Sequence, residues 1–227
     1  METVYVIDAV RTAIGRYGGA LSTIRPDDLL ADVIKRLVVR NQKIDVNEIE
    51  DVIAGDANQA GEDNRNVSRM AALMAGLPVS VAGNTVNRLC ASGLQAIMDA
   101  SRAIMVGDGN IFLAGGVESM TRAPFVMAKS EGAFSRKAEM YDSTIGWRFP
   151  NRKLTEKYFP FSMGETAENV AKQWNISREA QDEFAFNSQQ KYYQALAAGK
   201  WADEIVPVEI RPNKRDKATV QTDEDPR

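Results

Sequence analysis

The chain has 227 residues with one cysteine and no histidine, and its 28 basic and 31 acidic side chains give a formal net charge of −3. This length is enough for one large domain or two small ones, and the near-neutral balance gives no electrostatic reason to expect nucleic acid or an anionic membrane as a partner. A single cysteine forms no internal disulfide, which favours a reducing, cytoplasmic compartment. The apolar runs fall well short of the roughly 20 residues that span a bilayer, so we expect no transmembrane segment.

Short apolar runs alternate with amphipathic ones through the first half of the chain. Buried strands are predicted at residues 4–7, 51–55, 81–86 and 111–114. Helices are predicted to begin at Pro26, at Val67 and at Leu94, and the third stops before Gly107. A polar loop is predicted at residues 60–66. Strands that alternate with helices at this spacing indicate an α/β fold with parallel strands.

The pattern changes after Glu118. Residues 121–161 contain many aromatic, methionine and charged residues without a sustained period, which indicates an excursion from the core. Two helices are predicted after it, and Ser177 is a suitable cap for the second, which runs to Gly199. Residues 204–210 and 218–222 have the composition of a terminal strand pair.

Cys90 is the candidate nucleophile, because it opens the helix predicted near residue 94. The helix dipole and the unpaired N–H groups of a helix start favour a thiolate over a thiol. On spacing alone, a cysteine there is about twice as often a small core residue as a nucleophile. The small residues Ala91, Ser92 and Gly93 shift that balance, because they leave room for a large ligand. A thiol nucleophile also needs a base, and the chain has no histidine.

Other candidate sites have simpler interpretations. Gly115 and Gly116 follow a predicted strand, but no phosphate-binding glycine motif is present, so close backbone packing explains them better. Asp56, Glu62 and Asp63 lie on a loop without histidine or a second cysteine, and we interpret them as a solvated turn. We therefore predict no metal site.

Residues 87–93, Asn-Arg-Leu-Cys-Ala-Ser-Gly, closely resemble the active-site cysteine motif of thiolases. Further ordered stretches agree with that family: they are residues 8–12 with Gly15 and Arg16, residues 115–121 and residues 163–171. Within the family, residues 57–67 and 144–149 look most like the 3-oxoadipyl-CoA branch of bacterial aromatic-acid degradation. The resemblance covers the whole chain.

The resemblance implies a thiolase-like fold with two similar α/β core halves and a loop domain inserted in the first half. Residues 1–118 would form the first core half with the nucleophilic cysteine, and residues 119–227 a loop domain that is incomplete at its C-terminal end. In thiolases the second half supplies a histidine that activates the nucleophile and a second cysteine that moves protons. Because that half is absent here, we expect the isolated chain to be inactive.

The resemblance also implies roles for single residues. Cys90 would attack a 3-oxoacyl-CoA and carry the acyl group, and the acyl group would then pass to CoA. Met163, Phe149 and Arg227 would contact the acyl-CoA or CoA. CoA would be a substrate, and no other cofactor is expected. The parent protein would be a homodimer or homotetramer.

Three alternatives stay open at this point. The first is a fragment of an acetoacetyl-CoA thiolase. The second is a standalone, non-catalytic CoA-binding module that keeps the first half of the fold. The third is a related enzyme that joins acyl chains by decarboxylation, although the junction at residues 115–120 favours thiolases.

Overall fold

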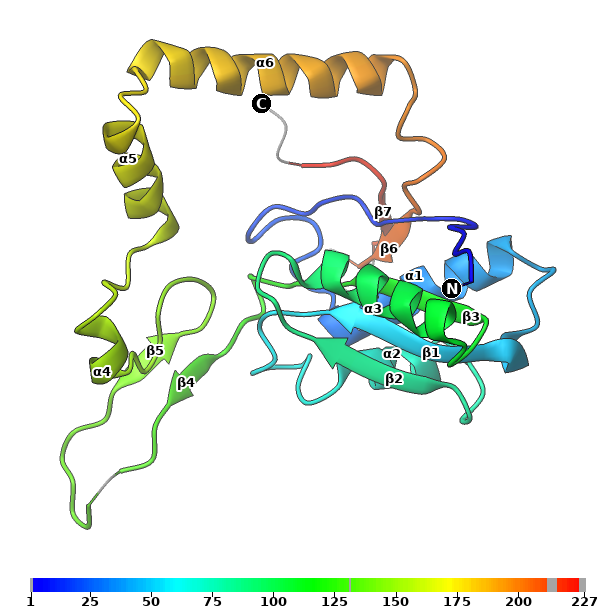
Figure 1. Cartoon of the computed structure of the whole chain (residues 1–227), viewed down its shortest axis with the longest axis horizontal. Coiled ribbons are helices and arrows are strands. Elements are labelled where there is room, and N and C mark those ends of the chain that lie inside the picture. The colour runs from blue at the N-terminus through cyan, green and yellow to red at the C-terminus, as the bar shows by residue number, and fades with distance from the viewer. Residues whose placement is uncertain (1, 131, 212–215, 225–227) are drawn as a thin grey trace. The chain divides into compact units, whose positions relative to one another are not determined.

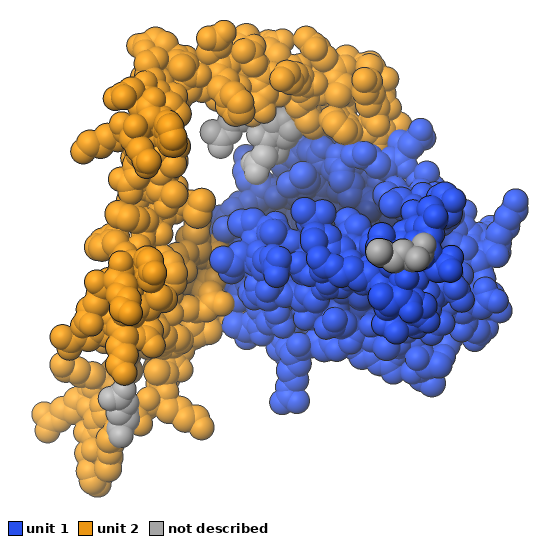
Figure 2. Space-filling model, in the orientation of Figure 1, with its two compact units in different colours: residues 1–123, 203–225 blue, residues 124–202, 226–227 orange. Residues whose placement is uncertain are grey.

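A computed structural model describes residues 2–130, 132–211 and 216–224, and its contacts divide the chain into two compact units. The first unit contains the chain up to Ala123 and the segment that begins at Asp203, and the second contains Pro124–Ala202 (Figure 2). The first unit is therefore discontinuous in sequence. The division into residues 1–118 and 119–227 that we expected from the resemblance stays a prediction.

A three-stranded parallel sheet organises the first unit, in the order β2-β1-β3. Strand β1 (Ile49–Gly55) lies between β2 (Ala82–Val86) and β3 (Ile111–Gly116) (Figure 1). Gly55 pairs with both Val86 and Gly116, so the three carboxyl ends meet at one edge of the sheet. The parallel sheet confirms the predicted α/β class.

Helices cover both faces of β1, because alternate side chains of a strand point to opposite faces. The helices of this unit are α1 (Pro26–Arg40), α2 (Val67–Met74) and α3 (Ser92–Val106), with a short 3-10 turn at Val46–Glu48. Val52 and Ala54 pack in one core with residues of α1 and α2, whereas Ile53 packs with Ala96 and Ala100 of α3. This alternation places α3 on the opposite side of the sheet from α1 and α2.

A hairpin of β6 (Val208–Ile210) and β7 (Ala218–Val220) completes the first unit. It buries Val208, Ile210 and Val220 against Ala13 in a separate small core. The Arg11 guanidinium donates two hydrogen bonds to the Asp223 carboxylate, at 2.7 and 3.1 Å. The segment after residue 203 is thus joined to the start of the chain, and the predicted strand pair is confirmed.

The second unit contains three helices and two short strands among its described residues. It contains the short strands β4 (Phe125–Met127) and β5 (Met140–Asp142), and the helices α4 (Arg152–Thr155), α5 (Met163–Gln173) and α6 (Arg178–Ala197). Ser162 and Glu165 form a reciprocal capping box at the start of α5, and the Ser177 hydroxyl accepts from the Ala180 N–H at the start of α6. Both predicted helices are confirmed, and neither contains a buried residue.

The strand predicted at residues 4–7 is wrong. These residues have no strand conformation, and the Val6 side chain is 81% exposed. An apolar run becomes a strand only where its backbone N–H and C=O groups pair with a neighbouring strand. No strand of the described residues pairs with this segment.

Among the residues that the structure describes, no helix has both the length and the apolar character needed to cross a membrane.

Candidate functional site

The candidate site lies where the three parallel strands end. The loop after β1 begins at Asp56, the loop after β2 carries Asn87 and Cys90, and the segment after β3 carries Glu118. Because Gly55 is in register with the last residues of both neighbouring strands, these segments start side by side. Parallel strands place ligand sites at this edge of a sheet in many α/β proteins.

Gly55 lets helix α3 approach the sheet edge closely. A Cβ atom at this position would lie 2.5 Å from the Gly93 nitrogen, and it would be closer still to the carbonyl carbon of Ser92. Real Cβ atoms do not make backbone contacts this short. The absence of a side chain at Gly55 therefore seats the first turn of α3 directly on the end of β1.

Glu118 and Asn87 tie the three strand-end segments together. The Glu118 carboxylate accepts hydrogen bonds from the backbone N–H groups of Ala57 and Asn58, at 2.9 and 3.2 Å. The Asn87 amide donates to the Ala57 carbonyl oxygen at 3.0 Å. The loop after β1 is consequently held from both sides, by the segment after β3 and by the segment after β2.

Cys90 lies in a sharp turn between β2 and α3. Its thiol is free and exposed, and it precedes the first helical residue, Ser92, by two positions. Leu89, just before it, has a φ of +50°, in the left-handed region that a leucine seldom adopts. The structure therefore confirms that Cys90 sits at the start of a helix, and its exposure argues against the alternative of a buried core residue.

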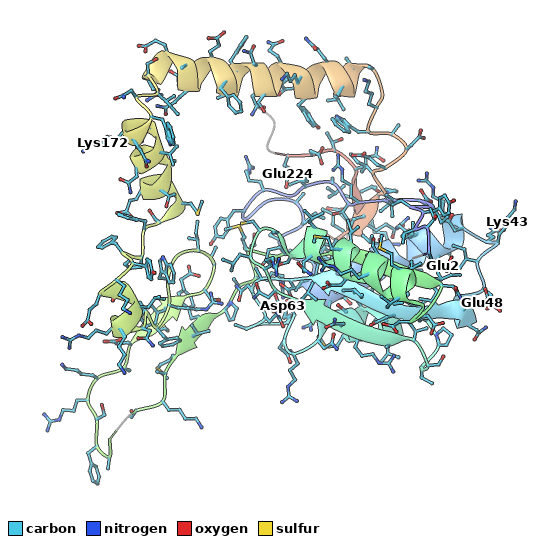
Figure 3. The ribbon with its side chains drawn as sticks, in the orientation of Figure 1. Glu2, Lys43, Glu48, Asp63, Lys172 and Glu224 are labelled. Atoms are coloured by element: carbon cyan, nitrogen blue, oxygen red, sulfur yellow. The ribbon has the colours of Figure 1, made fainter. Side chains whose placement is uncertain are left out.

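Two carboxyl groups beside the turn are buried, contrary to the solvated turn that we expected. Asp56 is 1% exposed and Asp63, which is labelled in Figure 3, is 5% exposed. Burial, together with the charges of Asp63 and Glu118, raises the pKa of Asp56 to about 8. Burial also raises the pKa of Asp63. Asp56 directly follows the four buried residues at 52–55 that end β1.

The described residues contain no group of three or more carboxylate or thiol side chains that could hold a metal ion. At the Asp56 carboxyl group, burial outweighs the backbone hydrogen bond from Asn58, which acts to lower the pKa. Burial of a carboxyl group favours its neutral, protonated form. The prediction that the protein uses no metal remains a prediction.

The other predicted site residues lie outside the first unit or outside the described residues. Met163 is the first residue of α5 and is 73% exposed. The Phe149 ring packs edge-on against Tyr141, with ring centroids 4.8 Å apart. Met163 and Phe149 belong to the second unit, whereas Cys90 belongs to the first. Arg227 lies outside the described residues.

Comparison with known proteins identifies the family. Residues 4–227 match the model of the thiolase N-terminal domain. The chain belongs to the thiolase family. A 3-oxoadipyl-CoA/3-oxo-5,6-dehydrosuberyl-CoA thiolase of Escherichia coli K12 is 57% identical over 99% of this chain and 56% of its own length. A beta-ketoadipyl-CoA thiolase of Acinetobacter baylyi is 54% identical over all of this chain and 57% of its own length.

A solved structure supports the same assignment. The acetyl-CoA acetyltransferase of Bacillus anthracis matches 96% of this chain and 53% of its own length, with a TM-score of 0.82 and 35% sequence identity. The chain thus has the fold of a thiolase half, as the motifs predicted. This thiolase chain spans about half the length of the curated relatives that it matches, which fits the N-terminal part of a thiolase.

Asn87, Glu118 and Asp56 shape the site although no role there was predicted for them, and Ser92 was expected only to leave room for a ligand. Their neighbours at the three strand ends are 30 or more residues away in sequence, as in the pairs of Asn87 with Ala57 and of Glu118 with Ala57. Only the parallel register of the sheet brings these positions together.

Proposed function

We propose that this chain is the N-terminal part of a 3-oxoadipyl-CoA thiolase in which Cys90 is the nucleophile. The observation that carries the proposal is the free, exposed Cys90 thiol at the start of α3, within a chain that is 54–57% identical to thiolases of this specificity. The close packing of Gly55, at the end of β1, against Ser92 and Gly93 fixes the start of the helix that follows Cys90.

The reaction proceeds in two acyl transfers. The Cys90 thiolate attacks the keto carbon C3 of 3-oxoadipyl-CoA, and the C2–C3 bond breaks. The electron pair of that bond leaves as the enolate of acetyl-CoA, which takes up a proton, and the acyl group remains on Sγ as a thioester. The thiolate of a second CoA then attacks this thioester, which releases succinyl-CoA and restores the Cys90 thiolate. The Cys90 backbone N–H serves as a donor to a developing oxyanion.

The proton transfers need groups that this chain does not contain. It has no histidine and no second cysteine, so the base that activates Cys90 and the acid that protonates the enolate come from the other half of the protein. Loss of such groups from a catalytic unit costs roughly 10³-fold or more. The 227-residue chain alone is therefore expected to show no thiolysis above background.

CoA and acyl-CoA are the proposed ligands, with CoA as a substrate and no further cofactor. Met163 and Phe149 are proposed contacts for the acyl and pantetheine part, and both are accessible at 73% and 46% exposure. Arg227 is proposed for the nucleotide end, because a guanidinium pairs well with phosphate. The proposal includes a cytoplasmic protein that works as a homodimer or homotetramer.

Thiolysis by the whole protein tests the proposal. We expect the whole protein to convert 3-oxoadipyl-CoA and CoA to succinyl-CoA and acetyl-CoA, measured by chromatography of the products, and Cys90→Ser to abolish this conversion. A Cys90→Ser variant that keeps wild-type thiolysis would remove Cys90 from the mechanism. A higher kcat/KM for acetoacetyl-CoA than for 3-oxoadipyl-CoA would replace the proposed substrate by that of the acetyl-CoA acetyltransferases.

A further inference from the structure

The turn that carries Cys90 is held in an unfavourable backbone conformation. Leu89 has a φ of +50°, and a leucine reaches this region only with a close approach of its Cβ to the backbone. Glycine, which has no Cβ, is the residue that normally occupies such positions. A leucine therefore stays there only where its surroundings hold the turn.

The side chains of Asn87 and Ser92, on either side of the turn, stabilise its conformation by hydrogen bonds. The Ser92 hydroxyl accepts from the Arg88 N–H at 2.8 Å and donates to the Leu89 carbonyl oxygen at 2.6 Å. The Asn87 side-chain oxygen accepts from the Leu89 N–H at 2.9 Å. The remaining carbonyl oxygen of the turn, that of Arg88, accepts from the Ala91 N–H at 3.1 Å. Every backbone polar group of Arg88 and Leu89 is thus paired.

Ser92 differs from the rest of the turn because it is fixed to the sheet. It is 4% exposed, and its backbone contacts Gly55 at the end of β1. Residues 87–91 are all exposed, so their own packing holds them weakly. The hydrogen bonds of the Ser92 hydroxyl consequently fix the conformation of the exposed turn and the position of the Cys90 thiol.

We propose that Ser92 is a positioning residue for the acyl-transfer step, because its hydroxyl holds Leu89 in the left-handed conformation that presents Cys90. This inference rests on the proposed function of Cys90 as the nucleophile. Ser92 itself does not contact the substrate in this scheme, and it acts only through the geometry of the turn. Removal of its hydroxyl releases two bonds at once, so Leu89 relaxes to an ordinary φ and the thiol loses its place before the first turn of α3.

The alkylation rate of Cys90 by iodoacetamide tests the positioning directly. Cys90 is the chain's one cysteine, so the intact mass of the protein reports its reaction without interference. We expect Ser92→Ala to slow alkylation about tenfold, because the turn then no longer holds the thiol in one fixed, exposed position for attack on the reagent. Ser101→Ala is the matched control: it removes a serine hydroxyl of the same helix that donates to the Ile97 carbonyl oxygen, and it should leave the rate unchanged.

A rescue experiment separates positioning from a general loss of structure. In the double variant Leu89→Gly/Ser92→Ala, glycine adopts the positive φ without the Cβ contact, so the turn no longer needs the hydroxyl. We expect the double variant to react several-fold faster than Ser92→Ala. Alkylation of folded Ser92→Ala at the wild-type rate, or no recovery in the double variant, would overturn the proposal. If Ser92→Ala does not fold, Asn87→Ala is measured instead. We expect the same decrease in the alkylation rate of Cys90 and the same recovery when Leu89→Gly is added.

Thiolysis by the whole protein distinguishes this inference from the proposed function. We expect Ser92→Ala to lower kcat about tenfold or more, with the KM for CoA unchanged within twofold, because a misplaced nucleophile slows the chemical step. If Cys90→Ser abolishes thiolysis but Ser92→Ala keeps the wild-type kcat, the positioning role alone is wrong. If Cys90→Ser keeps thiolysis, the proposed function is wrong and the inference is withdrawn with it.

Discussion

Substitution of the buried Asp56 should change how stability depends on pH. Burial and the charges of Asp63 and Glu118 raise the pKa of Asp56 from 3.8 to about 8. At pH 7 the folded chain therefore keeps a proton that the unfolded chain has released. The free energy of unfolding falls as the pH rises from about 4 to about 8, and this contribution is constant above that range.

The size of the effect follows from the two pKa values. The interval between the unfolded pKa of 3.8 and pH 7 is about 3 pH units, and each unit corresponds to about 1.36 kcal/mol. Asp56 therefore lowers the free energy of unfolding by about 4 kcal/mol over this range. Asp56→Asn has a similar shape and does not titrate. Its free energy of unfolding, relative to wild type, should therefore rise by about 4 kcal/mol between pH 4 and pH 7.

Urea unfolding at pH 4, 5.5 and 7 measures this difference. Any constant cost of burying an amide in place of the carboxyl group cancels, because only the change of the difference with pH enters. Asp142→Asn is the control: hydrogen bonds from Thr144 lower the pKa of Asp142, so its removal gives no gain as the pH rises. A difference between Asp56→Asn and wild type that stays within about 1 kcal/mol from pH 4 to pH 7 would refute a buried, protonated Asp56.

Two further substitutions test the packing and the caps. Gly55→Ala should lower the free energy of unfolding by about 3 kcal/mol, because the added Cβ meets the backbone of Ser92. Gly115→Ala is the control, because no atom lies within 4 Å of its added Cβ, and it should lower the free energy of unfolding by less than about 1 kcal/mol in the same urea titration. Ser162→Ala removes the capping box of α5, which should lower the stability of this helix by about 1 kcal/mol and speed amide exchange in its first turn. Ser162→Asn keeps a capping side chain and should leave the exchange rate unchanged. Equal exchange rates in the two variants would contradict the capping role.

The sequence predicted the elements whose pattern is local. The strands predicted at residues 51–55 and 111–114 and the helix predicted to begin at Pro26 correspond to β1, β3 and α1, because the apolar pattern of each lies within the segment itself. The apolar run at residues 4–7 has the same local pattern but forms no strand, since a strand also depends on a neighbour elsewhere in the chain.

The site was only partly predictable for a related reason. Cys90 was found from its motif and from the helix that follows it. The left-handed φ of Leu89 has no sequence marker, because glycine is the usual sign of that conformation. The buried Asp56 lies in a polar stretch that is typical of a solvated loop. Its burial depends on the register of the sheet, which places Glu118 and Asp63 beside it.

The ion pair between Arg11 and Asp223 has a consequence for the order in which the first unit is completed during synthesis. The two residues are 212 positions apart, and the whole second unit up to Ala202 is translated between them. At about 5–20 residues per second, Asp223 is made roughly 10 to 40 s after Arg11. Until then the small core around Ala13 has no hairpin to cover it. A nascent chain that stalls between Pro124 and Ala202 therefore leaves this apolar surface uncovered by its hairpin.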